Sequence, residues 1–378
     1  IVIVDTGSGD KTLEIAKKFN AKVIHNKWED DFSKARNISL DNAKMDWILV
    51  LDADETIAIQ DLQKIKELIK NNDYDGYMLI QRTYTNNSNS PKWISSKDDK
   101  YEESKQYSGW IYSGITRLFK NRKDIRFEYP VHETVKESIK RVKGKIAVTN
   151  IQIHHYGKLR DVNYVTKKSE LYLKLGKEKI KDTPNAKFYY ELGIQAQVLG
   201  NIEDAITSFN KAIEINPQII GAYVNLGNIY CKLGIYDKAV EILKNAENIN
   251  PNNSDLHNNL GIAYEKQDKI EEAFQEYGKS ILLNPNNIEA LLNASRILFQ
   301  AGELERVKTL LKRVLKLNPK EWHAHNILGI IYSLQEDLNS AVDCFKNALE
   351  IQPENKDILT NLRYTYIALG RNNDADDI

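Results

Sequence analysis

The stretch Ile48-Leu-Val-Leu-Asp-Ala-Asp-Glu55 begins with four apolar residues, and three carboxylates follow within the next four positions. A short continuous apolar run is typical of a strand buried on both faces, as in a parallel sheet covered by helices. Because such sheets bind ligands at the carboxyl ends of their strands, Asp52, Asp54 and Glu55 should lie where a ligand is expected. Carboxylates this close repel one another unless a cation is nearby, and oxygen ligands suit Mg²⁺ or Mn²⁺ that also holds a diphosphate. A second interpretation is that Asp52 and Asp54 cap a turn and the following helix.

The residues around this stretch alternate between short apolar strands and amphipathic helices. Strands are predicted at 1–4, 21–24 and 47–51, and helices at 11–19, 32–43 and 60–71. This order predicts an α/β domain with a parallel sheet and right-handed crossovers. Later strands are predicted at 76–85, 115–119 and 146–155, with a turn or loop at 86–91 and a flexible polar flap at 92–107.

Composition limits the classes of partner. The chain has 378 residues, and its 53 Lys and Arg balance its 53 Asp and Glu, so neither a nucleic acid nor a bare membrane surface is expected. The sequence contains no run of about 18 apolar residues, so no transmembrane segment is predicted. Cys231 and Cys344 lie far apart in helical sequence and are expected to be reduced packing residues of a cytoplasmic protein. Residues 1–5 already read as a strand without an initiator Met, so the chain is expected to begin inside a domain.

Other polar residues are candidates for the same site. His154 and His155 end the last predicted strand, and adjacent strand residues face opposite sides, so one of the two can face the carboxylates. That histidine could complete a metal shell or be a hydrogen-bonded structural residue. Glu133 is a candidate general base or an exposed loop carboxylate. Asp5 precedes the turn Gly7-Ser-Gly9 and could meet a nucleotide or cap the turn; the turn lacks the third glycine of a dinucleotide fingerprint.

Three motifs together resemble the family 2 glycosyltransferases of GT-A fold. They are Asp5-Thr-Gly-Ser-Gly-Asp-Lys-Thr12, Phe32-Ser-Lys-Ala-Arg-Asn37 and Trp47-Ile-Leu-Val-Leu-Asp-Ala-Asp-Glu55, in matching order across residues 1–157. The resemblance implies a nucleotide-sugar donor, usually UDP-linked, a divalent Mn²⁺ or Mg²⁺, and inversion of the anomeric centre by a single displacement. Family members normally begin with another strand and helix, so this GT-A domain is expected to be N-terminally incomplete.

The same resemblance implies roles for single residues. Asp5 would contact the nucleotide base, and Arg36 the nucleotide or its phosphates. Asp52 and Asp54 would be the D-x-D pair, with Asp52 also on the donor side and Asp54 the direct metal ligand. His155 would match a late histidine that some GT-A enzymes place near the metal.

The chemistry of sugar transfer fits this set of residues. A departing nucleoside diphosphate needs its charge neutralised, which a metal supplies. An acceptor hydroxyl or thiol needs a base on the opposite face of the sugar. By the resemblance, Glu133 would be that acceptor-side catalytic base.

Residues 186–378 repeat with a period of 34. The period is marked by prolines that each follow Asn or Gln, namely Pro217, Pro251, Pro285, Pro319 and Pro353. With Gly and Ala slots at the same period, this is the tetratricopeptide (TPR) pattern, and it predicts an all-α solenoid of five repeats plus a terminal helix. The small residues let paired helices approach closely, and proline ends each second helix. Residues 158–185 are expected to form a helical connector.

Asparagines recur at the sixth position of several repeats, where they should face the groove. They are Asn225, Asn259, Asn293 and Asn361. An amide can donate and accept at once, so such a row could hold the backbone of an extended acceptor peptide. It is similar to the asparagine ladder in the repeat domain of the eukaryotic protein O-GlcNAc transferase. The alternative is that these amides bond within the array.

Two functions from different classes fit the sequence. The first is a metal-dependent glycosyltransferase, of the hexosyltransferase class, whose repeats recruit a protein or peptide acceptor. The second is a non-catalytic TPR scaffold with a nucleotide-sugar-binding or vestigial front domain. A related enzyme alternative is nucleotidyl transfer, which would release pyrophosphate instead of UDP.

Overall fold

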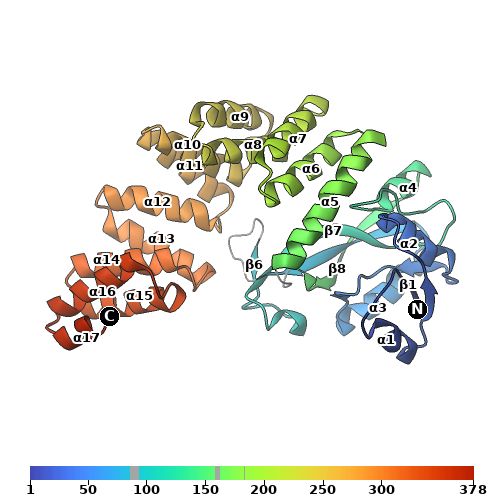
Figure 1. Ribbon diagram of the computed structural model, residues 1–378, viewed down its shortest axis with the longest axis horizontal. Coiled ribbons are helices and arrows are strands. Elements are labelled where there is room, and N and C mark those ends of the chain that lie inside the picture. The colour runs from blue at the N-terminus through green and yellow to red at the C-terminus, as the bar shows by residue number, and fades with distance from the viewer. Residues whose placement is uncertain (86–92, 158–161, 183) are drawn as a thin grey trace. The chain divides into compact units, whose positions relative to one another are not determined.

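The computed structural model describes residues 1–85, 93–157, 162–182 and 184–378 (Figure 1). The loop predicted at 86–91 lies outside these residues, as do the first four residues and residue 183 of the predicted connector. The described chain divides into two compact units, Ile1–Asn216 and Pro217–Ile378. Within the described ranges, no helix combines the length and apolar character needed to cross a bilayer.

Strands and helices alternate through the first unit. In chain order they are β1 (Val2–Asp5), α1 (Thr12–Lys18), β2 (Lys22–His25), α2 (Phe32–Asp41), β3 (Trp47–Leu49), β4 (Glu55–Thr56), α3 (Ile59–Leu68), β5 (Gly76–Tyr84), β6 (Ile94–Ser95), the short 3₁₀ helix η1 (Glu102–Ser104), β7 (Gly109–Lys120), α4 (Lys136–Arg141), β8 (Ile146–His155), α5 (Val162–Asp182), α6 (Ala186–Val198) and α7 (Ile202–Ile215). The predicted strands are therefore confirmed, although β7 is much longer than the segment predicted at 115–119.

The strands form two sheets. β1 and β2 pair in parallel, as the βαβ order predicts. The larger sheet has the order β3-β7-β5-β8-β4, with β6 also paired to β7. Its β5–β8 ladder is parallel, whereas β3, β5 and β6 each run antiparallel to β7. The prediction that the strand at 47–51 shares a parallel sheet with the first two strands is wrong, because helix–strand alternation does not encode pairing with a long later strand such as β7.

The apolar run at residues 48–51 lies at one edge of the larger sheet. Ile48 is buried, but Leu49 and Leu51 are 37% and 38% exposed. Among the described strands, β3 has a neighbour on one side only, which is β7. Burial of this run on both faces is therefore not observed.

Helices cover both faces of the larger sheet. On one face, α3 contributes Ile65 to a cluster with Tyr77, Leu79 and Ile153 of the sheet. On the other face, Leu40 of α2 and Ile139 of α4 belong to a cluster that also holds sheet residues. This layered α/β arrangement holds the strand ends and their polar side chains in fixed positions.

The segment predicted as a flexible flap is packed against the sheet in its described part, 93–107. Tyr101 is 1% exposed and donates a 2.9 Å hydrogen bond to Asp61. Arg82 pairs with Asp99 and lies 3.9 Å from the ring centroid of Trp110. The flap prediction is wrong because a polar composition can also serve a buried hydrogen-bonded network.

The second unit is a stack of helix pairs (Figure 1). Its helices are α8 (Ile220–Lys232), α9 (Tyr236–Ile249), α10 (Ser254–Lys266), α11 (Ile270–Leu283), α12 (Ile288–Gln300), α13 (Leu304–Leu317), α14 (Trp322–Leu334), α15 (Leu338–Ile351), α16 (Lys356–Ala368) and α17 (Asn372–Asp376). A Cβ added at Gly227 would lie 2.5 Å from Leu243, and one at Gly261 would lie 2.5 Å from Tyr277. The predicted close approach of paired helices, and with it the TPR solenoid, is confirmed.

Each first helix in the array ends in a turn residue with positive φ. Glycine fills this slot at Gly200, Gly234, Gly302 and Gly370, with φ between 72° and 76°. Asp268 and Glu336 occupy the same slot with φ of 64° and 60°. Two of the turns therefore place a side chain in a backbone region that favours glycine.

Candidate active site

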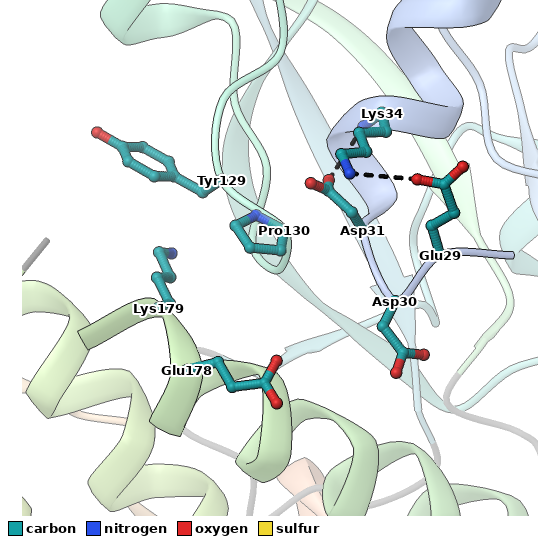
Figure 2. A pocket seen from close by; sticks show the side chains of 8 residues that line it. All are labelled: Glu29, Asp30, Asp31, Lys34, Tyr129, Pro130, Glu178 and Lys179. Carbon is teal, nitrogen blue, oxygen red and sulfur yellow. Dashed lines mark hydrogen bonds and ion pairs between the residues drawn. The ribbon is translucent and has the colours of Figure 1, made fainter. Parts of the chain in front are cut away.

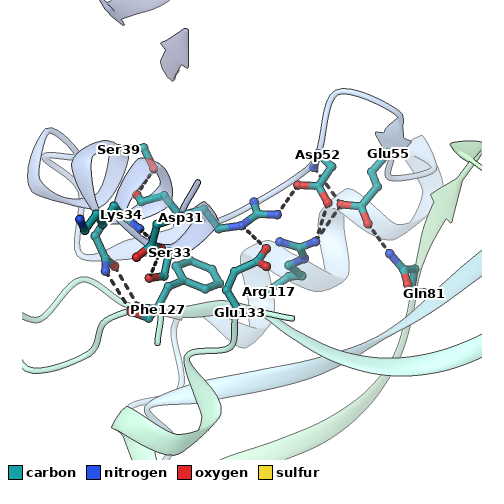
Figure 3. A network of polar contacts seen from close by, with 12 residues as sticks. Asp31, Ser33, Lys34, Ser39, Asp52, Glu55, Gln81, Arg117, Phe127 and Glu133 are labelled. Atoms are coloured by element: carbon teal, nitrogen blue, oxygen red, sulfur yellow. Dashed lines mark hydrogen bonds and ion pairs between the residues drawn. The ribbon is translucent and has the colours of Figure 1, made fainter. Parts of the chain in front are cut away.

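Asp52 lies between two arginines just after β3. Arg36 of α2 donates to its Oδ1 over 2.7 Å, and Arg117 of β7 donates to its Oδ2 over 2.8 Å (Figure 3). Burial raises the pKa of Asp52, but the charges of Arg117 and Arg36 outweigh burial and hold it below its ordinary value. The N-cap of α3 is Ala58, without a side-chain hydrogen bond, so neither Asp52 nor Asp54 is the N-cap of the following helix.

Glu55 fixes the turn that carries these carboxylates. It is 6% exposed, and its Oε2 accepts a 2.8 Å bond from the backbone N–H of Asp52. Gln81 of β5 donates to its Oε1, and Arg117 lies 3.7 Å from Oε2 (Figure 3). With both oxygens engaged inside the protein, Glu55 acts as an anchor of the turn.

Glu133 belongs to the same charge network. Its Oε1 accepts a 2.6 Å hydrogen bond from Nε of Arg36, and its side chain is 13% exposed. It is therefore not the exposed loop carboxylate of the alternative interpretation. Burial lowers the pKa of Arg36, but the charges of Glu133 and Asp52 prevail and raise it above its ordinary value. Arg36 thus links Asp52 to Glu133, the candidate base.

Helix α2 is fixed beside the chain segment that leads to Glu133. The side-chain amide of Asn37 donates to the carbonyl of Phe127 over 2.9 Å and accepts from its N–H over 2.9 Å. At the start of α2, Asp31 accepts a 3.0 Å bond from the N–H of Lys34 as N-cap (Figure 3). Because the helix is tied down at both points, the position of Arg36 is set by the backbone of its neighbours.

Asp54 and His155 form a second part of the site. Nε2 of His155 lies 3.6 Å from Oδ2 of Asp54, and Nδ1 of His155 lies 3.0 Å from the hydroxyl of Thr83. An imidazole whose Nδ1–H bonds an oxygen directs the free lone pair of Nε2 outward, which is how metal-binding histidines are commonly oriented. His154 points the other way, is fully buried and bonds Tyr84 over 2.7 Å, so one histidine faces the carboxylates, as predicted.

Gly157 borders the space between Asp54 and His155. A Cβ built on it would lie 2.6 Å from Nε2 of His155 and 2.7 Å from Oδ2 of Asp54. The missing side chain therefore leaves a small cradle lined by one imidazole nitrogen and one carboxylate oxygen. Both are ligand types that Mn²⁺ accepts, so these residues fit the predicted metal.

The charges around the cradle favour a divalent cation. Two arginines, Arg36 and Arg117, face four carboxylates, Asp52, Asp54, Glu55 and Glu133. The cluster thus carries two negative charges when all of these groups are ionised. A divalent ion would neutralise them and attract the phosphates of a donor.

Asp5 ends β1 and makes a separate set of contacts. It is 6% exposed, its Oδ1 accepts from the N–H of Ser8 over 3.0 Å, and its Oδ2 lies 3.2 Å from Nδ1 of His25. Hydrogen bonds from Ser8 hold its pKa below the ordinary value. This is the turn-capping geometry of the alternative interpretation, and no direct bond to the Asp52 network exists among the described residues.

The repeat asparagines are bonded within the array. Asn225 donates to the carbonyl of Gly221 over 2.7 Å, and Asn259, 5% exposed, donates to that of Val224 over 3.4 Å. Further along, the amides reach other asparagines: Asn293 donates to Asn258 and Asn361 to Asn326. The geometry favours the alternative of internal bonding, above all for the buried Asn259.

Sequence reasoning missed three residues of the site, Arg117, Thr83 and Gly157. Arg117 was detectable, because it interrupts the apolar segment Ile115-Thr-Arg-Leu-Phe119 and a charge inside a strand needs a buried partner. Thr83 and Gly157 carry no such signal, since their roles depend on the pairing of β5 with β8.

Comparison with known proteins agrees with this division of the chain. Residues 1–129 match the family described as glycosyl transferase family 2. Tetratricopeptide families match residues 199–234, 227–268, 264–328 and 323–355. Among solved structures, pilF of Pseudomonas aeruginosa is 20% identical, covers 51% of this chain and 87% of its own, and has a TM-score of 0.47. Yeast Tom70 is 21% identical over 53% of this chain and 43% of its own, with a TM-score of 0.44.

Curated relatives match parts of the chain. A TPR repeat-containing protein of Synechococcus elongatus is 33% identical over 43% of this chain and 36% of its own length. The SPbeta prophage-derived glycosyltransferase SunS of Bacillus subtilis is 24% identical over 56% of this chain and 46% of its own. An uncharacterised glycosyltransferase of Mycoplasma pneumoniae is 37% identical over 20% of this chain and 27% of its own. The matches span about a third to a half of the length of the first two relatives.

Proposed function

We propose that this chain, in which a family 2 glycosyltransferase domain precedes tetratricopeptide repeats, transfers a sugar from a nucleotide-linked donor to a protein or peptide acceptor. The donor is a UDP-sugar, and the anomeric centre is inverted in a single displacement. The observation that carries the proposal is the charge network in which Arg36 joins Asp52 to Glu133, beside the Asp54–His155 pair.

The donor side rests on Asp52, Asp54 and His155. Asp54 and His155 would hold a Mn²⁺ or Mg²⁺ ion at the cradle that Gly157 leaves open. When bound, such an ion neutralises the charge that develops on the departing diphosphate. Arg36 is a second cation close by, and the N–H groups that it does not donate to Asp52 and Glu133 would bind a phosphate oxygen.

The acceptor side rests on Glu133. A carboxylate 2.6 Å from a guanidinium is held in one orientation, which a base that must meet an acceptor hydroxyl or thiol requires. Glu133 would take the acceptor proton as the new bond to the anomeric carbon forms and the bond to the diphosphate breaks. Arg36, which touches both Glu133 and Asp52, would keep these two groups at a fixed separation.

The acceptor is proposed to be a polypeptide because tetratricopeptide repeats bind other polypeptides and do not themselves catalyse a reaction. TPR arrays present extended surfaces to other chains. Asn225 and Asn293 remain candidates for contact with an acceptor backbone, since both are partly exposed, whereas Asn259 is buried. The two exposed amides would have to exchange an internal hydrogen bond for one to the peptide.

Calorimetric titration of UDP with and without Mn²⁺ tests the donor site. The native chain is expected to bind UDP only with the metal, and Asp54→Asn is expected to lose that binding while its circular dichroism spectrum stays native. Asp61→Asn is a matched control, since Asp61 is a buried aspartate that bonds Tyr101 outside the site.

Three outcomes would count against the proposal. Metal-dependent binding that survives in Asp54→Asn would remove this residue from the metal site. No binding to the native chain would favour the scaffold function. Release of pyrophosphate instead of UDP from a bound donor would replace sugar transfer by nucleotidyl transfer.

A further inference from the structure

A lysine of α5 is buried against the loop that carries Glu133. Lys179 is 4% exposed, and its ammonium donates a 3.0 Å hydrogen bond to the carbonyl of Val131. Its Nζ lies 3.4 Å from the ring centroid of Phe188 and 4.5 Å from that of Tyr129. Glu191 of α6, 3.8 Å away, supplies the opposite charge. A buried charge with this many partners is costly to place and is held in one position.

The loop itself is strained. Residues 129–133 connect Glu128 and Thr134, which bond each other through both backbone amides at 3.1 and 3.2 Å. Within the loop, Tyr129 and His132 have φ of 77° and 51°, a region that side chains rarely adopt. Such residues persist when neighbouring structure over-determines them, and they concentrate at functional sites.

Contacts from helices α5 and α6 hold these loop residues in their strained conformation. The ring of Tyr129 meets Phe188 edge-on at 4.8 Å, and His132 meets Tyr172 at 5.2 Å. Together with the bond from Lys179, these contacts engage three successive parts of the loop just before Glu133. A cavity of about 340 Å³ separates part of the loop from α5, because Tyr129 and Pro130 line it together with Lys179 (Figure 2).

We propose that Lys179 is a positioning residue that holds the loop 129–133, and with it Glu133, in the orientation used for sugar transfer. The inference rests on the proposed function in one respect, the role of Glu133 as acceptor-side base. It extends the site to the helix that follows β8, so α5 acts as part of the transferase unit. Burial lowers the pKa of Lys179 to about 8, and Glu191 works against this shift, so the group still carries its charge at neutral pH.

The test compares two full-length variants, Lys179→Met and Lys177→Met. Methionine keeps most of the volume between the two aromatic rings but donates no hydrogen bond, so the fold is expected to remain. Lys177 lies two residues before Lys179 on α5, is 51% exposed and pairs with Asp204, which makes it the matched control. Three quantities are measured: amide hydrogen exchange of segment 128–134, affinity for UDP with Mn²⁺, and release of UDP from a panel of UDP-sugars.

In Lys179→Met, we expect exchange in segment 128–134 to quicken about tenfold, the scale of one lost hydrogen bond from a charged donor. UDP release should fall by about the same factor, because Glu133 is then less often in place. Affinity for UDP should stay within about twofold of native, and Lys177→Met should match the native chain in all three measurements.

Native exchange in segment 128–134 of Lys179→Met would overturn the proposal, as would a loss of UDP affinity equal to the loss of turnover. If the native chain releases no UDP from any donor, the proposed function fails, but the exchange experiment still decides whether Lys179 holds the loop. If Lys179→Met does not fold, Phe188→Leu takes its place, since it removes one of the two ring faces and the edge contact with Tyr129 while keeping apolar bulk.

Discussion

At the scale of single residues, arginines and carboxylates of the candidate site pair with one another without a ligand. Arg36 and Arg117 already pair with part of the carboxylate cluster, and their charges hold the pKa of Asp52 below its ordinary value without a metal. The carboxylate that faces the Gly157 cradle is Asp54. This separation supports Asp54, more than Asp52, as the direct ligand of a cation.

The first prediction concerns Gly157. In Gly157→Ala, the new methyl group would lie within 3 Å of both Asp54 and His155, so the imidazole has to move out of the cradle. We expect the affinity for Mn²⁺, measured by calorimetry in the presence of UDP, to fall at least about tenfold, the scale of a displaced ligand.

Gly278→Ala is the control for this change. Gly278 lies in α11 of the second unit, and a Cβ there meets no atom within 4 Å. Its variant should bind Mn²⁺ and UDP like the native chain. Native metal affinity in Gly157→Ala would mean that the cradle is not where the ion binds.

At the scale of helices and strands, the sequence predicted the elements better than their partners. Apolar runs and the 34-residue period placed nearly all strands and every helix pair, because these signals are local or repeat exactly along the chain. The partner of β3 and the packing of segment 93–107 depend on contacts with Arg117 of β7 and Asp61 of α3, far along the chain. For the candidate site, the motifs pointed to Arg36, Asp52 and Asp54, and the end of the last predicted strand pointed to His155, whereas Thr83 and Gly157 needed the strand register.

The second prediction is a pH dependence in the pair α10–α11. His257 is buried, its Nδ1 lies 2.6 Å from Glu276, and its Nε2 lies 2.7 Å from the carbonyl of Pro251. Burial lowers its pKa, but these two acceptors prevail and raise it above the ordinary 6.5, while Lys279 works against them. The charged form therefore stabilises the fold below pH 6.5, and this stability is lost as the pH rises further.

Thermal unfolding at pH 6 and pH 8.5 measures this loss. We expect about 1.5 kcal/mol, the scale of a hydrogen bond between charged groups, which corresponds to a fall of about 3–6 °C in the midpoint. In His257→Asn, the unfolding midpoints at pH 6 and pH 8.5 should differ much less than in the native chain. His325→Asn is the control, because His325 bonds the carbonyl of Pro319 in the same way but Cys344 stands in the repeat position of Glu276. An equal slope in native and His257→Asn chains would contradict the prediction.

The third prediction concerns the turn between paired helices. Glu336 has φ of 60° in a slot that glycine fills in four other repeats, and a left-handed side-chain residue costs about 1–2 kcal/mol. Glu336→Gly should therefore raise the unfolding midpoint by about 2–4 °C, as measured by thermal denaturation.

The reverse change, Gly302→Ala, is the counterpart in a neighbouring repeat. A Cβ at Gly302 meets no atom within 4 Å, so backbone strain alone should lower the midpoint by a similar amount. Opposite signs for the two variants are required. A lower midpoint for Glu336→Gly would show that the side chain of Glu336 contributes more than its backbone costs.

At the scale of the whole molecule, the first compact unit extends to Asn216. The sequence placed its functional boundary near residue 157 because the glycosyltransferase motifs end there. In the structure, α5 and α6 bury Leu175 and Phe188 within this unit and contact the Glu133 loop. The compact unit that holds the candidate site is therefore larger than the motif-bearing segment.

The fourth prediction follows from this boundary. A chain ended after residue 216 should unfold cooperatively and bind UDP with Mn²⁺ as tightly as the full chain. A chain ended after residue 185 loses Phe188 and Glu191, so it should be at least about 3 kcal/mol less stable, the cost of removing one buried aromatic side chain. Denaturant titration of the two chains measures the difference. Equal stability would show that α6 and α7 are not part of the first unit.

The edge of the larger sheet has a consequence for the behaviour of the protein in solution. Among the described strands, β3 is paired on one side only, which leaves backbone N–H and C=O groups available at its other edge. Beside β3, the side chains of Leu49 and Leu51 add apolar surface. Such an edge accepts a strand from another molecule. The apparent molar mass from light scattering should therefore rise with the concentration of this chain, and a peptide that pairs with β3 should suppress that self-association.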